Sequence, residues 1–401
     1  MLLFQVLLAC TPETLDGTPT VQDSDEATTV EGRCADGWGA ITVLDVETAL
    51  HVSPEGAPDA TGSYDNPFDS INGALEFARE SNATPDIAVW PGEYATSLTL
   101  LVDTGAGVDD SGARIVGCGA DEVILVGAED RPVMDVVGVA DILVRGVTLR
   151  GGYRGLTVRG GSSFEAEGVV IEDAVRTGVF IAGAETNATL VDTVVRGVQL
   201  DQEAYGWGIV VQDATVVLNE VDVTDVHAVG VLVEFGNATF SGGTIRGVVA
   251  DEQGLFGRGV QLQNLAQGAL ADLGVEATAD AGVFAHRTVA LDVNNIWVVD
   301  TGGGLTAEGT PTGDGLVVTQ ANGNNDPADF QVSVTDSIFE GSDRAGVVLD
   351  GVTATLNGVT TPESGLEDGG IGVWAQNGAQ VTGENNLAAE PLGLNLLTLS
   401  D

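Results

Sequence analysis

A glycine followed by an aliphatic residue recurs along this sequence and constrains its fold more than any other feature. Successive copies are 22 to 33 residues apart, a spacing typical of solenoid repeats, in which each coil packs on its neighbours. The copies are Gly155-Leu156, Gly178-Val179, Gly208-Ile209, Gly230-Val231, Gly259-Val260, Gly282-Val283, Gly315-Leu316, Gly346-Val347 and Gly372-Val373. The chain is therefore expected to stack coils rather than to build a globular core.

Each repeat contains three short strand-like segments. In one repeat they cover 208–211, 214–218 and 221–223, and the turn Asn219-Glu220 joins the last two. Sharp turns of this kind favour glycine and asparagine, which tolerate a left-handed backbone. Equivalent turns are Glu167-Gly168, Gly242-Gly243, Asn294-Asn295, Asp336-Ser337 and Asn357-Gly358. This pattern predicts an all-β, single-stranded parallel β-helix (a solenoid) with about eleven or twelve coils.

Alternation along the first strand predicts that Ile209 and Val211 point inward and Val210 outward. The outward positions of all first strands form a mostly apolar row: Thr157, Phe180, Val210, Leu232, Gln261, Phe284, Val317, Val348 and Trp374. Either this row binds a sugar or a partner, or the long loops cover it. Helical bundles are disfavoured, because no segment after residue 80 keeps a helical period.

A short helix is expected ahead of the repeat. Ile71, Ala74, Leu75 and Ala78 have helical spacing, and Asp69 is placed as the N-cap. Strand-like segments flank this helix on both sides. Residues 49–98 therefore predict strand, helix and strand in turn, with an N-terminal strand-helix cap at 38–85 ahead of a β-helix at 86–401.

Three motifs in this region resemble the opening of a known family. They are His51-Val52-Ser53, Asn66-Pro67-Phe68-Asp69-Ser70-Ile71 and Trp90-Pro91-Gly92-Glu93-Tyr94. The segment is similar to the start of secreted bacterial right-handed parallel β-helix proteins of the pectin-lyase-like type. The resemblance covers about 50 residues and implies that the helix caps the first coil. It implies little about activity.

The charge of the chain excludes several partners. There are 60 acidic and 14 basic residues, a net charge of −46, and every basic residue is an arginine. Binding to nucleic acid and polybasic docking on a membrane both require a basic surface, so neither is expected.

The first ten residues, MLLFQVLLAC, look like a bacterial lipobox, with Cys10 as the lipidated residue. The acidic segment 11–37 follows and is expected to be a disordered tether. By this resemblance, the protein is a lipoprotein of the outer membrane or cell surface, or else a secreted protein. Cys34 and Cys118 either form a disulfide in an oxidising compartment or remain two unpaired residues.

Two similar inserts precede first strands and indicate a candidate site. They are 201–207 and 251–257, and a third insert covers 300–314. All three should project from one edge of the rod and line a groove. The expected ligand-binding residues are Tyr205, Trp207, Phe256, Phe284, His286 and Trp374. Tyr205, Trp207 and Phe256 are expected to share a single groove beside Leu232 and Phe284.

Charged residues at the same edge allow a second interpretation. Asp201, Glu203, Asp251 and Glu252 are candidate calcium ligands, because calcium prefers several carboxylate oxygens. Arg176 and Arg258 would then be candidate catalytic bases for elimination on an acidic polysaccharide. The simpler interpretation is that arginines here pair with carboxylates and tie adjacent coils together.

Two functions follow from these observations. The first is a surface-tethered, non-catalytic β-helix that contacts glycans or neighbouring surface proteins. The alternative is a polysaccharide lyase or glycoside hydrolase that acts in the loop groove, with calcium as its cofactor if one is used. The lyase and polygalacturonase signatures of the resembled family are absent from the sequence, which favours the first function. A tailspike-like adhesin is disfavoured by the lipobox.

Overall fold

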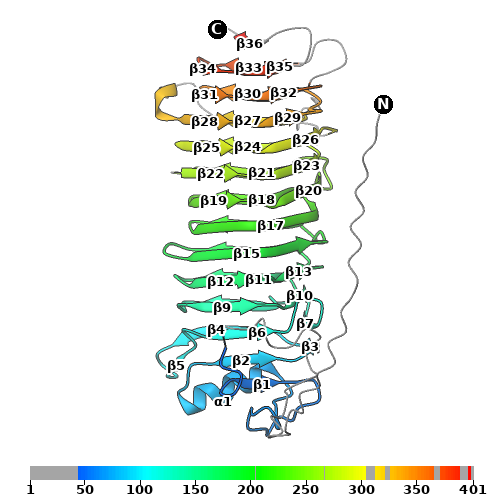
Figure 1. The fold of residues 1–401 in the computed structure, drawn as a ribbon, viewed down its shortest axis with the longest axis vertical. Helices are drawn as coiled ribbons and strands as arrows, with labels where there is room; N and C mark the ends of the chain where they lie inside the picture. The colour runs from blue at the N-terminus through cyan, green and yellow to red at the C-terminus, as the bar shows by residue number, and fades with distance from the viewer. Residues whose placement is uncertain are drawn as a thin grey trace, which may run out of the picture.

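The computed structural model describes residues 44–203, 205–265, 267–303, 312–320, 326–364, 371–388 and 396–398. These residues form a right-handed parallel β-helix, and the strands of successive coils stack along the long axis of the rod (Figure 1). This confirms the predicted fold class. Cys10, the tether at 11–37 and most of the insert at 300–314 lie outside the described residues. Cys118 is disulfide-bonded; Cys34, the candidate partner in the sequence, also lies outside the described residues.

The first strands of the coils form one sheet of 13 strands. Its strands are parallel, except that β5 pairs antiparallel with β4. The aliphatic residues of the nine predicted glycine pairs occupy a single register column, from Leu156 to Val373, as the repeat predicts. The strands are β4 (Leu98–Asp103), β5 (Val108–Asp109), β8 (Met134–Val137), β11 (Arg154–Arg159), β14 (Thr177–Ala182), β16 (Trp207–Gln212), β18 (Val229–Glu234), β21 (Arg258–Gln263), β24 (Ala281–His286), β27 (Asp314–Thr319), β30 (Ala345–Asp350), β33 (Ile371–Gln376) and β36 (Leu396–Thr398).

The remaining strands form a second sheet of 23 strands, which holds the second and third strands of each coil. The second-strand positions are β1 (Leu50–Val52), β2 (Asp86–Val89), β6 (Arg114–Gly117), β9 (Ile142–Arg145), β12 (Ser163–Glu167), β15 (Asn187–Arg196), β17 (Thr215–His227), β19 (Asn237–Ser241), β22 (Gln267–Ala271), β25 (Ala290–Asn294), β28 (Gln331–Thr335), β31 (Thr353–Asn357) and β34 (Gln380–Glu384). The third-strand positions are β3 (Gly92–Ala95), β7 (Val123–Gly127), β10 (Thr148–Gly151), β13 (Val170–Glu172), β20 (Thr244–Val249), β23 (Gly274–Thr278), β26 (Trp297–Thr301), β29 (Ile338–Glu340), β32 (Thr360–Thr361) and β35 (Leu387–Ala388). Strands β15 and β17 run through both positions without a break.

The bend between second and third strands uses a left-handed residue, as the turn pattern predicts. Gly168 has φ 59°, and Gly358 has φ 67°. Side chains other than glycine also occupy this position, including Asn295 at φ 50° and Glu220 at φ 51°. Because the bend needs only one such residue, strand β17 continues through Glu220 as a single element.

The core is the column of inward aliphatic side chains. Ile209 and Val211 are fully buried in it, as predicted. Val210 points away from this column, but it is also fully buried, in a separate cluster with Ala228 and Leu232. The outward row of the first sheet is therefore largely covered rather than bare. This outcome favours the covered alternative over an open apolar stripe.

The anchor glycines permit close approach between coils. A Cβ atom added to Gly178 would lie 2.8 Å from the carbonyl oxygen of Gly208 in the next coil. Backbone atoms cannot move aside at that distance without breaking the strand pairing between coils. The repeated glycine is thus required by packing.

A helix caps the first coil. Helix α1 (Ile71–Ser81) buries Ile71, Ala74, Leu75 and Ala78, as its spacing predicts. The predicted N-cap, Asp69, is wrong: Ser70 is the N-cap, and its Oγ accepts a hydrogen bond from the Gly73 N–H at 3.3 Å. The helix begins one residue later than the sequence suggests.

A short 3-10 helix, η2 (Pro327–Asp329), is the other helical element described. Within the described part of the chain, no helix is both long enough and apolar enough to cross a membrane.

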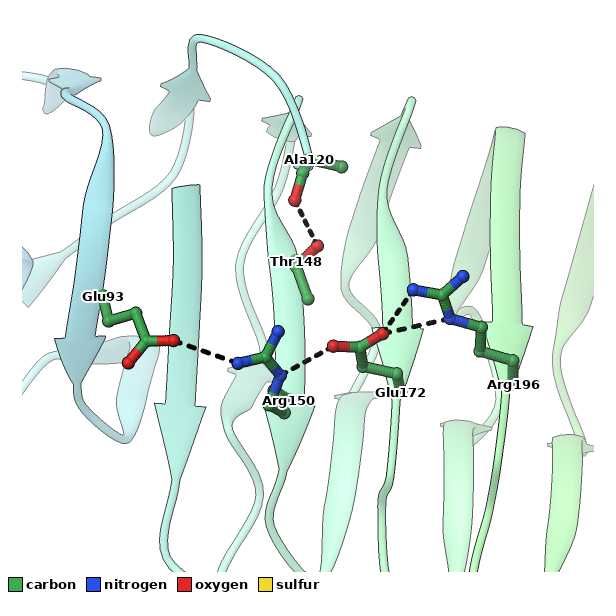
Figure 2. Close-up of polar contacts among 6 residues, drawn as sticks. All are labelled: Glu93, Ala120, Thr148, Arg150, Glu172 and Arg196. Atoms are coloured by element: carbon green, nitrogen blue, oxygen red, sulfur yellow. Dashed lines mark hydrogen bonds and ion pairs between the residues drawn. The ribbon is translucent and has the colours of Figure 1, made fainter. Parts of the chain in front are cut away.

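Arginines tie neighbouring coils of the second sheet together through carboxylates. Figure 2 shows one such ladder, in which the Arg150 guanidinium lies between Glu93 at 3.1 Å and Glu172 at 2.6 Å. Arg196 donates to the other oxygen of Glu172 at 2.6 Å. These four side chains come from four coils, and strand β7 of a further coil lies between the strands of Glu93 and Arg150. The ladder matches the simpler interpretation of the arginines.

Candidate functional site

The two inserts, which lie at the N-terminal ends of strands in the first sheet, have the same loop geometry. In each, the first residue donates its backbone N–H to a carbonyl four residues later: Asp201 to Tyr205 at 2.8 Å, and Asp251 to Leu255 at 2.9 Å. The Oδ1 atom of each aspartate accepts two backbone N–H groups of its own loop. The sequence similarity of the inserts therefore reflects a shared loop structure.

This geometry corrects the calcium prediction. In both Asp201 and Asp251, the Oδ1 atom accepts hydrogen bonds from the residue's own loop. In addition, Asp201 and Glu203 pair with Arg176, at 3.0 and 3.2 Å. Glu252 is exposed. Across the residues described, no group of three histidine, cysteine or acidic side chains could hold a metal ion. The structure does not bring these four carboxylates together.

The insert at 251–257 forms one wall of a cleft, which we call the Phe256 cleft. Its volume is about 350 Å³. The opposite wall comes from strands β24 and β27 and from the residue that precedes β30. The cleft is lined by Leu255, Phe256, Arg258, Asp280, Ala281, Phe284, Thr312, Asp314, Val317 and Arg344.

Two ion pairs lie in this cleft with opposite polarity. The Arg258 Nε donates to Asp280 Oδ2 at 2.6 Å, and the Arg344 Nε donates to Asp314 Oδ1 at 2.8 Å. Burial raises the pKa of Asp314, and the hydrogen bond from Arg344 opposes that rise. Each pair joins adjacent coils, so the cleft is polar but has little net charge.

Phe256 has the features of a binding residue. The residue is 41% exposed, and its backbone is left-handed at φ 62°. A bulky side chain rarely adopts this conformation, and strain of this kind gathers at functional sites. The Arg258 guanidinium carbon lies 5.3 Å from its ring centroid and 3.7 Å from that of Phe284. Phe256 is therefore an exposed aromatic residue of the cleft lining.

A second group of aromatic and cationic side chains lies on the same edge, nearer the N-terminal end. We call it the Arg154 cluster; its members are Tyr153, Arg154, Arg176, Phe180, Tyr205 and Trp207. Arginines and rings alternate along it. The guanidinium carbon of Arg154 is 3.8 Å from the Phe180 centroid, and that of Arg176 is 4.3 Å from the Tyr205 centroid. Tyr205 and Trp207 meet edge to face at 4.6 Å.

The predicted aromatic residues thus divide into two groups instead of sharing one groove. Tyr205 and Trp207 belong to the Arg154 cluster, where Trp207 packs against the buried cluster that contains Leu232. Phe256 and Phe284 line the Phe256 cleft. The polar Gln261 stands between Leu232 and Phe284 in the strand register. It interrupts the apolar row at that point.

The other two predicted binding residues lie outside the cleft lining. His286 is half-buried on β24, and burial lowers its pKa, with a further contribution from Arg287. Trp374 packs against Val348, and the Arg344 guanidinium carbon lies 5.7 Å from its ring centroid. Trp374 therefore belongs to a largely buried apolar part of the outward row.

The candidate bases are engaged as cations. Arg176 holds two carboxylates, and these contacts and Tyr153 outweigh burial and raise its pKa. Arg258 is held by Asp280. A base must give up its proton, which the neighbouring carboxylates oppose. Sequence reasoning did not single out Asp280 or Tyr153. Their roles depend on register between coils, for which the sequence carries no local signal.

Comparisons with known proteins show no matching family model and no matching curated protein. Solved structures with a similar path of the chain include the catalytic domain of a GH87 alpha-1,3-glucanase in complex with tetrasaccharides (12% identity, 89% of this chain and 68% of that one, TM-score 0.49). Others are the A-module of an Azotobacter vinelandii mannuronan C-5 epimerase (12%, 80% and 95%, 0.38) and the Dettilon tailspike protein (9%, 85% and 68%, 0.40). At such identities the likeness concerns the fold alone.

Proposed function

We propose that this protein is a non-catalytic, surface-tethered β-helix that binds glycans in the Phe256 cleft. One observation carries the proposal: an exposed aromatic residue with a strained backbone lines a cleft whose charged groups are paired with one another. Ligand sites typically combine apolar and aromatic walls with a few fixed polar groups. The ring of Phe256 offers a face for a sugar ring, and the Arg258 and Arg344 pairs offer donors and acceptors for its hydroxyl groups.

The charges of the cleft favour binding over catalysis. Asp280 and Asp314 are the carboxylates of the lining, and each is held by an arginine. The side chain of Asp314 is 2% exposed, so a substrate cannot reach it without breaking its pair with Arg344. A general acid or base needs direct access to the reacting atom.

The surface location is proposed from the sequence. Lipidation at Cys10 would anchor the chain in the outer membrane or at the cell surface, and the acidic segment 11–37 would hold the rod away from the lipid. The Phe256 cleft would then meet extracellular glycans. A neighbouring surface protein is the other class of partner.

A binding screen with the full chain tests this proposal. We expect a neutral or acidic polysaccharide to bind, and Phe256→Ala to lower its affinity at least about tenfold. The matched control is Phe235→Ala. Phe235 is also exposed and left-handed, at 58% and φ 56°, but it follows β18 at the opposite edge of the first sheet. Equal losses in both variants, or binding of a surface protein but no glycan, would contradict the proposal.

Hydrolysis or elimination is the second candidate function, and one observation favours it. Asp314 and Asp280 lie close enough to interact electrostatically, and burial and this neighbour raise the pKa of Asp314. A carboxyl group with a raised pKa beside a second carboxyl group is a pattern found in glycosidases. The same polysaccharides, incubated with and without calcium and followed for reducing ends and for absorbance of unsaturated products, distinguish the functions. Turnover that Asp314→Asn abolishes would replace the binding proposal by a catalytic one.

A further inference from the structure

We propose that Arg154 binds the acidic group of a glycan, either a uronate carboxylate or a sulfate ester. This inference rests on the proposed glycan-binding function and names the class of its ligand. It comes from a comparison between two copies of one structural unit within the chain.

The unit is an arginine that begins one first-sheet strand and stacks on a phenylalanine in the next. Arg154 begins β11 and stacks on Phe180 of β14 at 3.8 Å. Four strands further along the same sheet, Arg258 begins β21 and stacks on Phe284 of β24 at 3.7 Å. Arg154 pairs in register with Thr177, as Arg258 does with Ala281. The two arginines therefore occupy equivalent positions.

The two units differ in the residue that faces the arginine. In the second unit this residue is Asp280, which precedes Ala281 and accepts a hydrogen bond from Arg258 at 2.6 Å. In the first unit the equivalent residue, preceding Thr177, is Arg176. Asp314 and Arg344 form a third pair at these positions, again with opposite charges. Only Arg154 and Arg176 place two cations together among these three pairs.

Arg154 is consequently left without a carboxylate partner in the described structure. It is half-buried, and its Nε is fully buried with no hydrogen-bond acceptor. Burial lowers its pKa, and the charge of Arg176 lowers it further. The nearby Asp135 is held by both ends of the Arg159 guanidinium, at 3.1 and 2.9 Å. An unpaired, partly desolvated cation is unfavourable. The chain has a net charge of −46, so acidic side chains that could pair with Arg154 are abundant in it.

A planar oxyanion fits this position. A guanidinium binds a carboxylate or sulfate through two parallel hydrogen bonds, and this geometry distinguishes arginine from lysine. The flanking rings of Tyr153 and Phe180 fit a sugar better than a flexible acidic peptide, because rigid rings pack against rigid rings. The Arg154 cluster and the Phe256 cleft share one sheet edge. Four strand spacings, or about 19 Å, separate them, so an extended acidic polysaccharide could contact both.

Calorimetric titration of the full chain tests this assignment. The probes are an oligouronate, a sulfated oligosaccharide, a neutral oligosaccharide of equal length and an acidic peptide. Arg154→Gln should weaken binding of one or both acidic glycans by about ten- to a hundredfold and leave the neutral probe unchanged. Comparing the oligouronate with the sulfated oligosaccharide identifies which acid group is bound. Arg246→Gln removes one arginine from β20 of the second sheet and should change neither affinity.

A second variant guards against a folding defect at Arg154. Arg176→Asp places a carboxylate where Asp280 stands in the other unit, so Arg154 should pair internally and the acidic glycans should again lose affinity. Thermal unfolding of both variants shows that they are folded.

Several outcomes would overturn the assignment. The assignment is wrong if the affinity for the acidic glycans is unchanged in both Arg154→Gln and Arg176→Asp. It is also wrong if the wild-type chain binds neutral and acidic probes equally, or binds the acidic peptide more tightly than the glycans. If Phe256→Ala still lowers glycan affinity in those cases, the proposed function stands while this inference fails. If no probe binds the wild-type chain, both fail.

Discussion

Arg258 and Asp280 come from adjacent coils and meet at 2.6 Å, with the guanidinium stacked on Phe284. The same two positions hold Asp314 and Arg344 in reverse polarity, and Arg154 and Arg176 with like charge. Equivalent pairs of positions along the rod therefore carry three different combinations of charge. The backbone positions are equivalent, so the side-chain charges alone decide whether the two residues form an ion pair.

Removing one partner of this pair should destabilise the rod. Asp280→Ala leaves the Arg258 guanidinium unpaired at a mostly buried position, and we expect a loss of about 2–4 kcal/mol in the free energy of unfolding. Urea unfolding at constant m-value measures the loss. The double variant Arg258→Asp with Asp280→Arg reproduces the polarity of Asp314 and Arg344 and should recover about half of it. No recovery would show that the pair is not the source of the stability.

An anchor glycine should not tolerate a methyl group. In Gly282→Ala the added Cβ would lie 2.8 Å from the carbonyl oxygen of Gly315 in the next coil, and we expect a cost of about 3 kcal/mol from overpacking. Gly105→Ala is the control, since its nearest neighbour is a side-chain oxygen of Asp103, and its effect should stay within about 0.5 kcal/mol. Differential scanning calorimetry compares the two. Similar melting temperatures would refute the packing role of the glycine.

Helix α1 should depend on Ser70 and not on Asp69. Ser70→Ala removes the acceptor for the Gly73 N–H and should cost about 1 kcal/mol. Asp69→Ala should change stability by less than about 0.5 kcal/mol. Protease sensitivity of the cap and chemical unfolding check both values. The reverse order would restore Asp69 as the N-cap.

The cap should weaken as the pH falls. Burial lowers the pKa of His51 below its usual value of 6.5, and its Nδ1 accepts a hydrogen bond from the Trp90 indole at 3.1 Å. The unfolded chain therefore binds this proton more readily than the folded chain. The stabilising contribution is complete above pH 6.5 and is lost as the pH falls toward the lower folded-state pKa.

His51→Gln should reduce the difference in unfolding free energy between pH 7.5 and a pH below the usual histidine range. NMR titration of the three histidines separates His51 from His227 and His286, whose pKa values burial also lowers. A normal or raised pKa for His51 would contradict the prediction.

The fold could be predicted from the sequence because its signals are local. The Gly208-Ile209 type of anchor, the alternation of Ile209 and Val211, and the left-handed turn residues each lie within a few positions of one another. These patterns predict the strand length, the inward face and the bend of each coil. The helix was predicted from four apolar residues for the same reason. Only its N-cap was displaced, by one residue, because Asp69 and Ser70 are both good caps.

The candidate site depended on tertiary structure. Which residue faces Arg154 or Arg258 is decided by strand register between coils that are 22 to 33 residues apart, and no local pattern states that pairing. The sequence by itself determined the β-helix, because each coil repeats one local rule. Only the stacked structure decided that Asp280 neutralises Arg258 while Arg176 leaves Arg154 unpaired, because Coulomb interactions depend on distance in space and not along the chain.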